Sequence, residues 1–453
     1  MTTDSAFAPP SAMRPSRTTE REGGASLAII LLIILILPNE LAFAIGDVVF
    51  TPIRFVLFLI AIPVAFRFVV SSRIYCFDIL YILFALWTGF SIIVNRGITG
   101  VQGAGQFILE SVIIYMSAVV FLNSYKKIFQ FLSGFVIIIT TLVIAAIPEV
   151  ILERHIILDF FASVMGKPDV RDGLGGERFG IMRAATVFRH PIHFGVFCAS
   201  AFALVWYAFP SGFGRLWRLG VSVIGAFLAI SSGPILALMI QIFSCLIEAT
   251  TRWLKNRASI FTIGLSFFLV SVHLLASRGL FALVAIFALN PSTAYHRKHI
   301  WENGIDDVLR SPLFGIRPET WTRPHWMQPS VDNFWLFQAM QGGIPSVIFL
   351  IASIILIVRY VFSRSSQCID LPIRNFRHGY VFMISSLVIC GATVHYFSSI
   401  KPFFALMIGL GAAIVRVSTA EALRLEHEHV EQSHRPEASA NARRNAFLES
   451  AYR

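Results

Sequence analysis

Charged residues are scarce in this sequence of 453 residues. Only 14% of the residues are charged while 56% are hydrophobic, and the mean hydropathy is +0.71. A water-soluble domain cannot bury that much apolar surface, so the soluble classes of protein are excluded. Segments of roughly ten residues with alternating hydrophobicity, typical of a transmembrane β-barrel, are also absent from the sequence. The composition therefore indicates an integral membrane protein made of helices.

Cysteine is sparse too, and its placement argues against two kinds of site. The five cysteines lie in or beside apolar runs, at Cys76, Cys198, Cys245, Cys368 and Cys390. The sequence therefore predicts neither a disulfide framework nor a zinc site. A Walker lysine motif is also missing, which argues against an ATP-driven pump in one chain.

Hydrophobic runs of about twenty residues recur along the chain, each long enough to cross a hydrocarbon core of roughly 30 Å as a helix. The expected spans are 27–46, 50–70, 75–94, 105–122, 128–148, 191–209, 217–231, 234–250, 259–277, 343–362, 379–397 and 402–417. The pair 217–231 and 234–250 has a second interpretation as one helix bent around Gly233-Pro234, and 278–290 either extends the ninth span or lies at the interface. The predicted fold is an all-α polytopic membrane protein of about twelve transmembrane helices.

Lysine and arginine set the expected orientation, because short cytoplasmic loops retain them. With the N-terminus inside, every inner connection is basic and the short outer connections carry fewer cations. The basic residues of the inner connections are Arg67, Arg73, Lys126, Lys127, Arg215, Arg218, Arg252, Lys255, Arg257, Arg359, Arg364, Arg374 and Arg377. An even number of spans then places both termini in the cytoplasm.

The two ends of the chain differ in composition from the apolar middle. Residues 1–26 are rich in Ser, Thr, Pro and Arg, and residues 418–453 in Glu, His, Arg and Ala. We expect cytoplasmic tails at both ends, with at most a short helix near 418–431, around a transmembrane domain over 27–417. The first apolar run follows a basic stretch as a signal peptide would. It is interrupted by Pro38-Asn39-Glu40 and ends without a small-residue cleavage site, which favours an uncleaved span.

Two long outer loops, about 149–190 and 278–342, are rich in Arg and His. Long loops translocate largely regardless of charge, so most of these residues are expected to form solvated surface. As a cluster they predict an anionic ligand, because the planar guanidinium of Arg donates paired hydrogen bonds to phosphate. The net charge of +11 does not require nucleic acid, since the orientation rule and contacts with anionic membrane lipids account for much of it. We expect no nucleic-acid partner.

Three local patterns follow one another along the second half of the chain. They are Arg183-Ala-Ala-Thr-Val-Phe-Arg-His-Pro-Ile-His-Phe-Gly195, then Arg297-Lys-His-Ile-Trp301 with Ser311-Pro-Leu-Phe-Gly-Ile316, then Asp332-Asn-Phe-Trp-Leu336 with Gly342-Gly-Ile344. In order and spacing, over roughly 170–417, they resemble the O-antigen ligase and polysaccharide polymerase family of bacterial envelope enzymes. Each pattern is weak alone, and the three in order around a long outer loop are fairly specific.

The resemblance implies transfer of a glycan from undecaprenyl diphosphate to an acceptor hydroxyl at the outer surface of the bacterial inner membrane. Such a reaction needs cations to stabilise the departing diphosphate and a base to take the acceptor's proton. Arg183 and Arg297 match the family's diphosphate-binding arginines, and Arg189 is a third candidate. Each arginine has a second interpretation, as a cap on backbone carbonyls or a contact to lipid headgroups. The supporting candidates are His193, Asn333 and Trp301.

The candidate bases are Asp332 and His325. The family's ligases carry His directly before the Asn, whereas this chain carries Asp332. A carboxylate can serve as base, but Asp is also a preferred N-cap, so Asp332 is open to both interpretations. His325 suits the task by the usual pKa of imidazole. A second departure is Ser231-Ser232-Gly233-Pro234, where many relatives have Ser-Arg-Gly, which puts a third phosphate contact in doubt.

Asp332 in place of His favours a polymerase of exopolysaccharide or O-antigen repeats over a ligase to lipid A core. No Asp-x-Asp pair marks the outer loops, so we expect neither a metal nor a cofactor. The expected partners are the lipid-linked glycan, membrane lipids and a polysaccharide chain-length regulator. The rival class is a transporter or flippase, which would place ionisable residues at mid-membrane. The candidates for that role are Glu110, His273 and His395.

Overall fold

The computed structural model describes residues 23–46, 48–166, 176–251, 291–365 and 371–451, and these are almost entirely helical. The helices are α1 Gly23–Ile36, α2 Pro52–Ser71, α3 Cys76–Arg96, α4 Gly100–Ile108, α5 Ile114–Phe121, α6 Tyr125–Ile151, α7 Ile156–Val164, α8 Pro191–Ala199, α9 Phe202–Ala208, α10 Phe213–Leu228, α11 Ser232–Thr250, α14 Pro291–Arg310, α15 Phe334–Ser365, α16 Leu371–Cys390 and α17 Ile400–Ala451. A hairpin of β1 Phe43–Ile45 and β2 Val48–Phe50 precedes α2.

Seven helical stretches of the described chain are long and apolar enough to cross a membrane. They are Pro52–Ser71, Cys76–Phe121, Tyr125–Ile151, Pro191–Ala208, Ser232–Thr250, Phe334–Ser363 and Ile400–Leu425. The stretch Cys76–Phe121 contains two of the expected spans, because the chain turns at Gly97 and α4 packs back on α3. The helical, multi-pass class predicted from composition is confirmed, and the count of about twelve spans stays a prediction.

One of the expected spans comes out differently, one pair is observed as two helices as expected, and one span lies outside the described residues. The run 27–46 is not one helix, because α1 ends at Ile36, two residues before Pro38, and the hairpin follows. The pair at 217–231 and 234–250 forms two helices, since the chain breaks at Ile230, which has a positive φ of 39°. The expected span 259–277, the stretch 278–290 and His273 lie outside the described residues.

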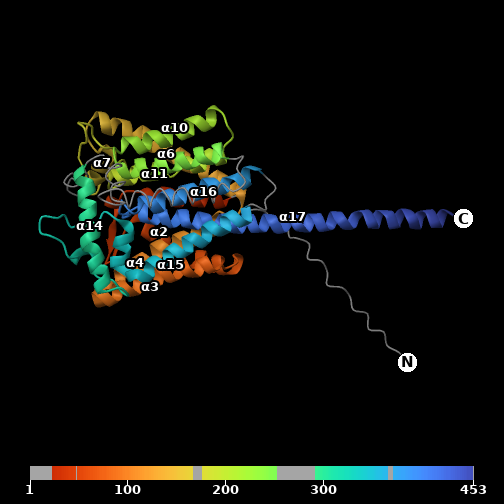
Figure 1. Ribbon diagram of the computed structural model, residues 1–453, viewed down its shortest axis with the longest axis horizontal. Coiled ribbons are helices and arrows are strands. Elements are labelled where there is room, and N and C mark those ends of the chain that lie inside the picture. The colour runs from red at the N-terminus through yellow and green to blue at the C-terminus, as the bar shows by residue number, and fades with distance from the viewer. Residues whose placement is uncertain (1–22, 47, 167–175, 252–290, 366–370, 452–453) are drawn as a thin grey trace, which may run out of the picture.

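Most helices run side by side, and two depart from the bundle in ways that matter for function (Figure 1). Helix α14 lies across one end of the bundle. Helix α17 begins at that end, passes through the bundle and projects from the opposite end, continuing through Ala451 where only a short helix was expected. We call the end covered by α14 the α14 end.

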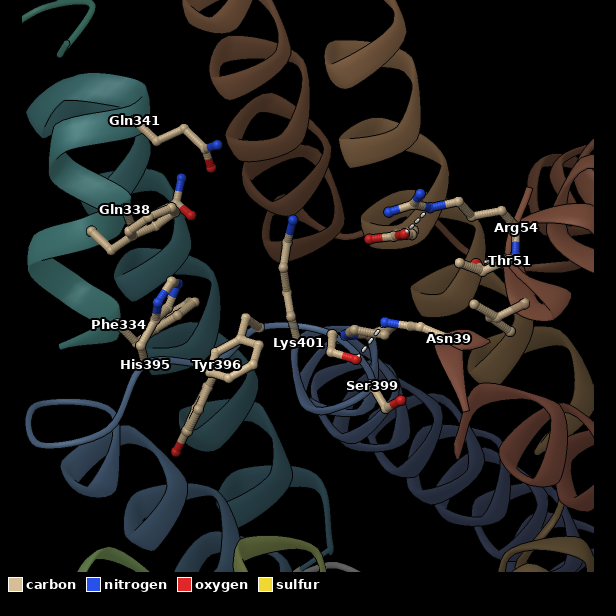
Figure 2. A pocket seen from close by; sticks show the side chains of 16 residues that line it. Asn39, Thr51, Arg54, Phe334, Gln338, Gln341, His395, Tyr396, Ser399 and Lys401 are labelled. Atoms are coloured by element: carbon tan, nitrogen blue, oxygen red, sulfur yellow. Dashed lines mark hydrogen bonds and ion pairs between the residues drawn. The ribbon is translucent and has the colours of Figure 1, made fainter. Parts of the chain in front are cut away.

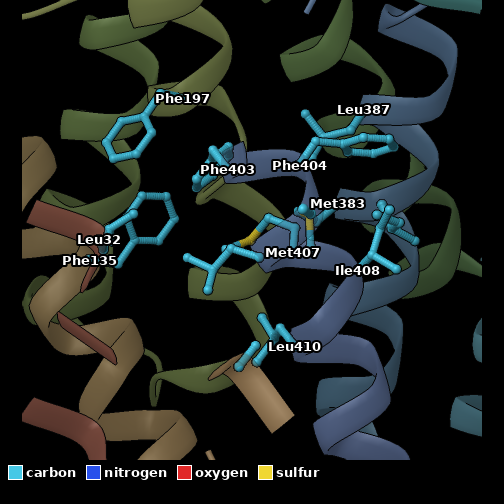
Figure 3. Close-up of a cluster of buried hydrophobic side chains, with 14 of the residues drawn as sticks. Leu32, Phe135, Phe197, Met383, Leu387, Phe403, Phe404, Met407, Ile408 and Leu410 are labelled. Carbon is cyan, nitrogen blue, oxygen red and sulfur yellow. The ribbon is translucent and has the colours of Figure 1, made fainter. Parts of the chain in front are cut away.

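The first part of α17 forms the centre of the bundle. Almost every residue from Phe403 to Val417 is buried, which is typical of a helix that is apolar all round. Figure 3 shows Phe403 beside Phe135 and Phe197, with Phe404 beside Leu387. The Phe197 and Phe403 ring centroids are 4.8 Å apart. A rigid central helix therefore supports the loops that cover its first turn.

The segment 311–316 docks on a kink in α15. Gly343 interrupts the helix with a φ of 71°, and the N–H of Ile344 donates to the carbonyl of Pro312 at 2.8 Å. In return the N–H of Ile316 donates to the carbonyl of Met340 at 2.6 Å. Two of the segments that carry the family resemblance thus bind each other, and they fix α14 relative to α15.

Gly315 is the residue that makes this docking possible. Its φ is 68°, and a Cβ there would lie 2.0 Å from the carbonyl oxygen of Met340. We expect Gly315→Ala to lower the thermal unfolding midpoint of the purified protein by several degrees, because both the backbone and the contact are strained. Gly220→Ala in α10 is the matched control, since a Cβ there meets nothing within 4 Å. Equal midpoints for the two variants would contradict the docking role of Gly315.

The expected orientation gives a topology prediction. Reporter tags after residue 453 and within 359–378 should report the cytoplasm, because the inner connections are basic. Tags near 165 and 320 should report the outer side, which would place the α14 end outside. Each tagged protein is compared with its untagged parent for membrane level. A cytoplasmic signal from the tag near 320 would overturn the orientation and the placement of the site.

Candidate functional site

A cavity of about 700 Å³ lies at the α14 end, and we call it the arginine cavity. Its walls come from five separate parts of the chain: the approach to α8, the start of α11, α14, the approach to α15, and the link from α16 to α17. The charged and polar residues that line it are Arg178, Arg183, His190, His193, Ser231, Ser232, Tyr295, His296, Arg297, Gln328, Ser330, Asp332, Thr393 and His395. Residues more than 200 positions apart thus meet in one site.

The arginine cavity brings together some of the expected site residues and leaves out others. Arg183, Arg297, Asp332 and His193 line it. The remaining candidates lie outside its walls, namely Arg189, His325, Trp301 and Asn333. Arg189 and His325 are exposed, so the expected diphosphate contact of Arg189 and the base role of His325 lose their geometric support. Trp301 instead packs in an apolar cluster beneath α14.

The loop that carries Arg183 is tied down by a buried carboxylate. Glu149, in the last turn of α6, accepts the N–H groups of Ala185 at 3.2 Å and Thr186 at 2.9 Å. Thr186 has a positive φ of 53°, and these two bonds hold that turn. The loop is therefore positioned by α6 as well as by the helix it precedes.

Arg183 and Arg178 both bind the turn between α10 and α11. Arg183 Nε donates to the carbonyl of Ala229 at 3.1 Å, and Arg178 Nη1 donates to the carbonyl of Ile230 at 3.2 Å. These carbonyls follow the end of a helix, where helical partners are missing. The interpretation of Arg183 as a carbonyl cap is thus correct for one of its nitrogens, while the residue also lines the cavity.

Burial and mutual repulsion act on the cavity's cations. The pKa of Arg183 is lowered to about 10, first by burial and then by the nearby Arg178 guanidinium. Burial also lowers the pKa of Arg297, and the Asp332 carboxylate opposes that effect. With a pKa of about 10, Arg183 keeps its charge at pH 7. A bound anion would offset both causes of the shift.

Arg297 is presented to the cavity by the packing of α14. The apolar face of α14 buries Ile300 against Leu336 and Met340 of α15, and Gly304 allows the close approach. Arg297 itself is 7% exposed, and its Nε has no hydrogen-bond partner among the described residues. A buried guanidinium with an unused donor is suited to an anionic ligand.

Asn333, and not Asp332, caps α15. Its Oδ1 accepts the N–H of Leu336 at 2.9 Å, and its Nδ2 donates to the carbonyl of Ala392 at 2.7 Å. This is the N-cap geometry, with the side chain bonded to the third helical N–H. The interpretation of Asp332 as the helix cap is therefore wrong. The half-buried Asp332 carboxylate is left facing the cavity.

Two of the four histidines that line the cavity, His190 and His193, have assigned hydrogen bonds. His190 Nδ1 accepts the N–H of Ile192 at 3.1 Å and so caps α8. Burial, then His193, Arg183 and Arg178, lower the pKa of His190 to about 3, so its ring is neutral at pH 7. His193 Nε2 bonds the carbonyl of His395 at 3.0 Å, which assigns the proton to Nε2. The bond to Ile192 occupies His190 Nδ1, so that nitrogen is not available to take a proton from a ligand.

The electrostatics of the arginine cavity favour an anion. Three arginines face one carboxylate, and the imidazoles of the wall carry no negative charge. Helices α8 and α11 both begin at the wall, near Ile192 and Ser232, and the N-terminus of a helix carries partial positive charge. The arrangement is suited to a phosphate or diphosphate.

One residue of this wall, Arg178, was not identified as a site residue from the sequence. Arg178 is one of many cations in its loop, and no pattern of neighbours distinguishes it. Ser231 and Ser232, where the sequence put a third phosphate contact in doubt, do line the cavity. Arg178 bonds Ile230, the residue before them, so its guanidinium lies beside this turn.

Comparison with known proteins adds no relative. A scan against protein-family models and a search of curated proteins find no match. Within the described ranges, no three His, Cys, Asp or Glu side chains gather as metal ligands would. Fold and site therefore define a multi-pass helical membrane protein with a basic cavity at one end of its bundle.

Proposed function

We propose that this chain is a glycosyltransferase that moves a glycan from an undecaprenyl-diphosphate donor to an acceptor hydroxyl at the outer face of the inner membrane. The observation that carries the proposal is the arginine cavity, where Arg178, Arg183 and Arg297 surround the space faced by Asp332. A leaving diphosphate needs concentrated positive charge, and an acceptor hydroxyl needs a base. The cavity supplies both from this chain's own residues.

The reaction assigns one role to each group. The acceptor oxygen attacks the anomeric carbon of the donor sugar while the bond from that carbon to the diphosphate oxygen breaks. The Asp332 carboxylate takes the acceptor's proton, and the arginines stabilise the charge that develops on the departing diphosphate. Because each of the three arginines can donate paired hydrogen bonds, the leaving group is also held in one orientation.

Arg178 is the third diphosphate contact in this proposal. Family members place an arginine in the motif that here reads Ser231-Ser232-Gly233. In this chain, Arg178 lies in the segment before α8 and donates a hydrogen bond to the carbonyl of Ile230 in the same turn. The charge of the site is thereby kept although the motif has changed.

We propose a polymerase of exopolysaccharide or O-antigen repeats, working with a chain-length regulator and with both termini in the cytoplasm. Deleting the gene in its host and examining the surface glycan by gel and mass spectrometry tests this. A polymerase predicts accumulated single repeats, whereas a ligase predicts intact polymer left on the carrier lipid. An unchanged glycan profile would contradict both activities.

A further inference from the structure

A second cavity, of about 220 Å³, lies next to the arginine cavity (Figure 2). We call it the lysine cavity after Lys401, which lines it. The two cavities share His395 and Phe397 as a common wall. On its other side the lysine cavity shares Arg54, Glu110 and Lys401 with a third cavity of about 440 Å³. The three form a row across the α14 end.

The lysine cavity is lined by two cations, Arg54 and Lys401, and one carboxylate, Glu110. Arg54 Nε and Glu110 Oε1 form an ion pair at 2.6 Å. Lys401 points into the space between this pair and Gln341, as Figure 2 shows. Its ammonium lies 3.9 Å from the centre of the Phe107 ring, and it forms no hydrogen bond or ion pair within the described part of the chain. Two cations therefore share one carboxylate.

The position of Lys401 in α17 is also unfavourable for a cation. Lys401 is the second residue of α17, and a cation near the N-terminus of a helix is disfavoured by the helix dipole. Departures of this kind are expected at functional sites, where a ligand supplies the missing favourable interaction. An anionic group beside Lys401 would meet both the ammonium and the start of α17.

The rest of the lining is typical of a sugar site. Gln341 supplies an amide group that can bond hydroxyls, and Ser399 adds a hydroxyl. The amide nitrogens of Gln338 and Asn39 donate to Thr88 and Ser398, so these two residues offer their amide oxygens as acceptors. The rings of Phe334, Phe337 and His395 form an apolar side on which the C–H face of a sugar can pack. Such a combination holds a small polyhydroxy ring better than it holds an acyl chain.

We propose that the lysine cavity binds the acceptor sugar and that this sugar carries a carboxylate, as a hexuronic acid does. The carboxylate binds Lys401 and Arg54, and the ring hydroxyls bond the amide of Gln341 and the amide oxygen of Gln338. The ring then lies beside His395 and Phe397, which line both cavities, so the acceptor is next to the cavity that Asp332 lines. The role of this sugar as the acceptor rests on the proposed transferase function. Binding of the sugar is tested without transfer.

The experiment measures binding of methyl β-glucuronide, methyl β-glucoside and inorganic phosphate to the purified protein in phosphatidylcholine nanodiscs, by titration calorimetry. We expect the glucuronide to bind about tenfold more tightly than the glucoside, as one charge-assisted contact provides. Lys401→Met should abolish that preference, and Lys401→Arg should retain it. Lys298→Met is the matched control, because Lys298 is exposed on α14 and pairs with Glu302 outside the cavities.

Two results would overturn the inference. Equal binding of glucuronide and glucoside to the wild type would show that the carboxylate is not recognised. Phosphate binding as tightly as the glucuronide, and lost in Lys401→Met, would assign the cations to a phosphate such as a lipid headgroup. The two proposals can fail separately. If the wild type and Arg183→Ala both prefer the glucuronide but the wild type transfers no glycan, the carboxylate site is supported and the transferase proposal fails.

Discussion

Arg297→Ala should reduce glycan transfer by about a hundredfold or more while the protein stays folded in the membrane. Removing one preorganised donor from a developing anion typically has an effect of that size. Arg297 is the sharpest test because its Nε has no hydrogen-bond partner in the described structure. Arg183→Ala should also reduce transfer strongly, but Arg183 Nε binds the carbonyl of Ala229 as well. A loss of transfer in Arg183→Ala would therefore combine the loss of a ligand contact with the loss of the bond to the turn between α10 and α11.

Lysine replacement separates charge from geometry at the same position. We expect Arg297→Lys to recover little activity, because a point charge cannot reproduce paired hydrogen bonds to a diphosphate. Arg189→Ala is the matched control, since Arg189 is exposed and lies outside the arginine cavity. The measurement is transfer from a lipid-linked repeat at equal protein. Full activity in Arg297→Ala, or an equal loss in Arg189→Ala, would remove the arginine cavity from the mechanism.

Asp332→Asn should lower transfer by about a hundred- to ten-thousand-fold, the usual effect of losing a general base. The substitution keeps the size of the side chain and removes its basic carboxylate. Stability should be unchanged, because the cap of α15 is Asn333. His325→Gln should be almost silent, since His325 is exposed outside the cavity.

The control for Asp332→Asn is Asp306→Asn, an exposed acid of α14 that does not line the cavity. Thermal unfolding of each variant shows whether a rate loss comes from the fold. Near-normal transfer by Asp332→Asn would mean that the acceptor's proton leaves by another route. A large loss in His325→Gln would return the base role to His325.

Much of the helical framework could be predicted from the sequence, because membrane spans are set by local hydrophobicity and length. The prediction of a single span over 27–46 was wrong. The run is apolar enough for a span, but α1 ends before Pro38 and the chain then forms a hairpin. Helix α14 shows the opposite case. It is polar over much of its length, and nothing local indicates that it lies across the end of the bundle.

The candidate site was predicted in part, and the reason differs from residue to residue. Arg183, Arg297 and Asp332 were found because each belongs to a pattern with other residues around it. Asp332 and Asn333 are adjacent and both are good caps, so only the observed bond to Leu336 assigns the cap. Arg178 reaches the cavity through the tertiary fold alone, since its partner Ile230 is 52 positions away.

The most direct test of the proposed function is a transfer assay with the purified protein in vesicles and one lipid-diphosphate-linked repeat as both donor and acceptor, in the presence of a metal chelator. The reaction we propose releases undecaprenyl diphosphate together with an equal amount of lengthened lipid-linked glycan, and Arg297→Ala does neither. Donor that stays intact, or that crosses the bilayer without cleavage of its glycosyl bond, would contradict a transferase and favour the carrier class.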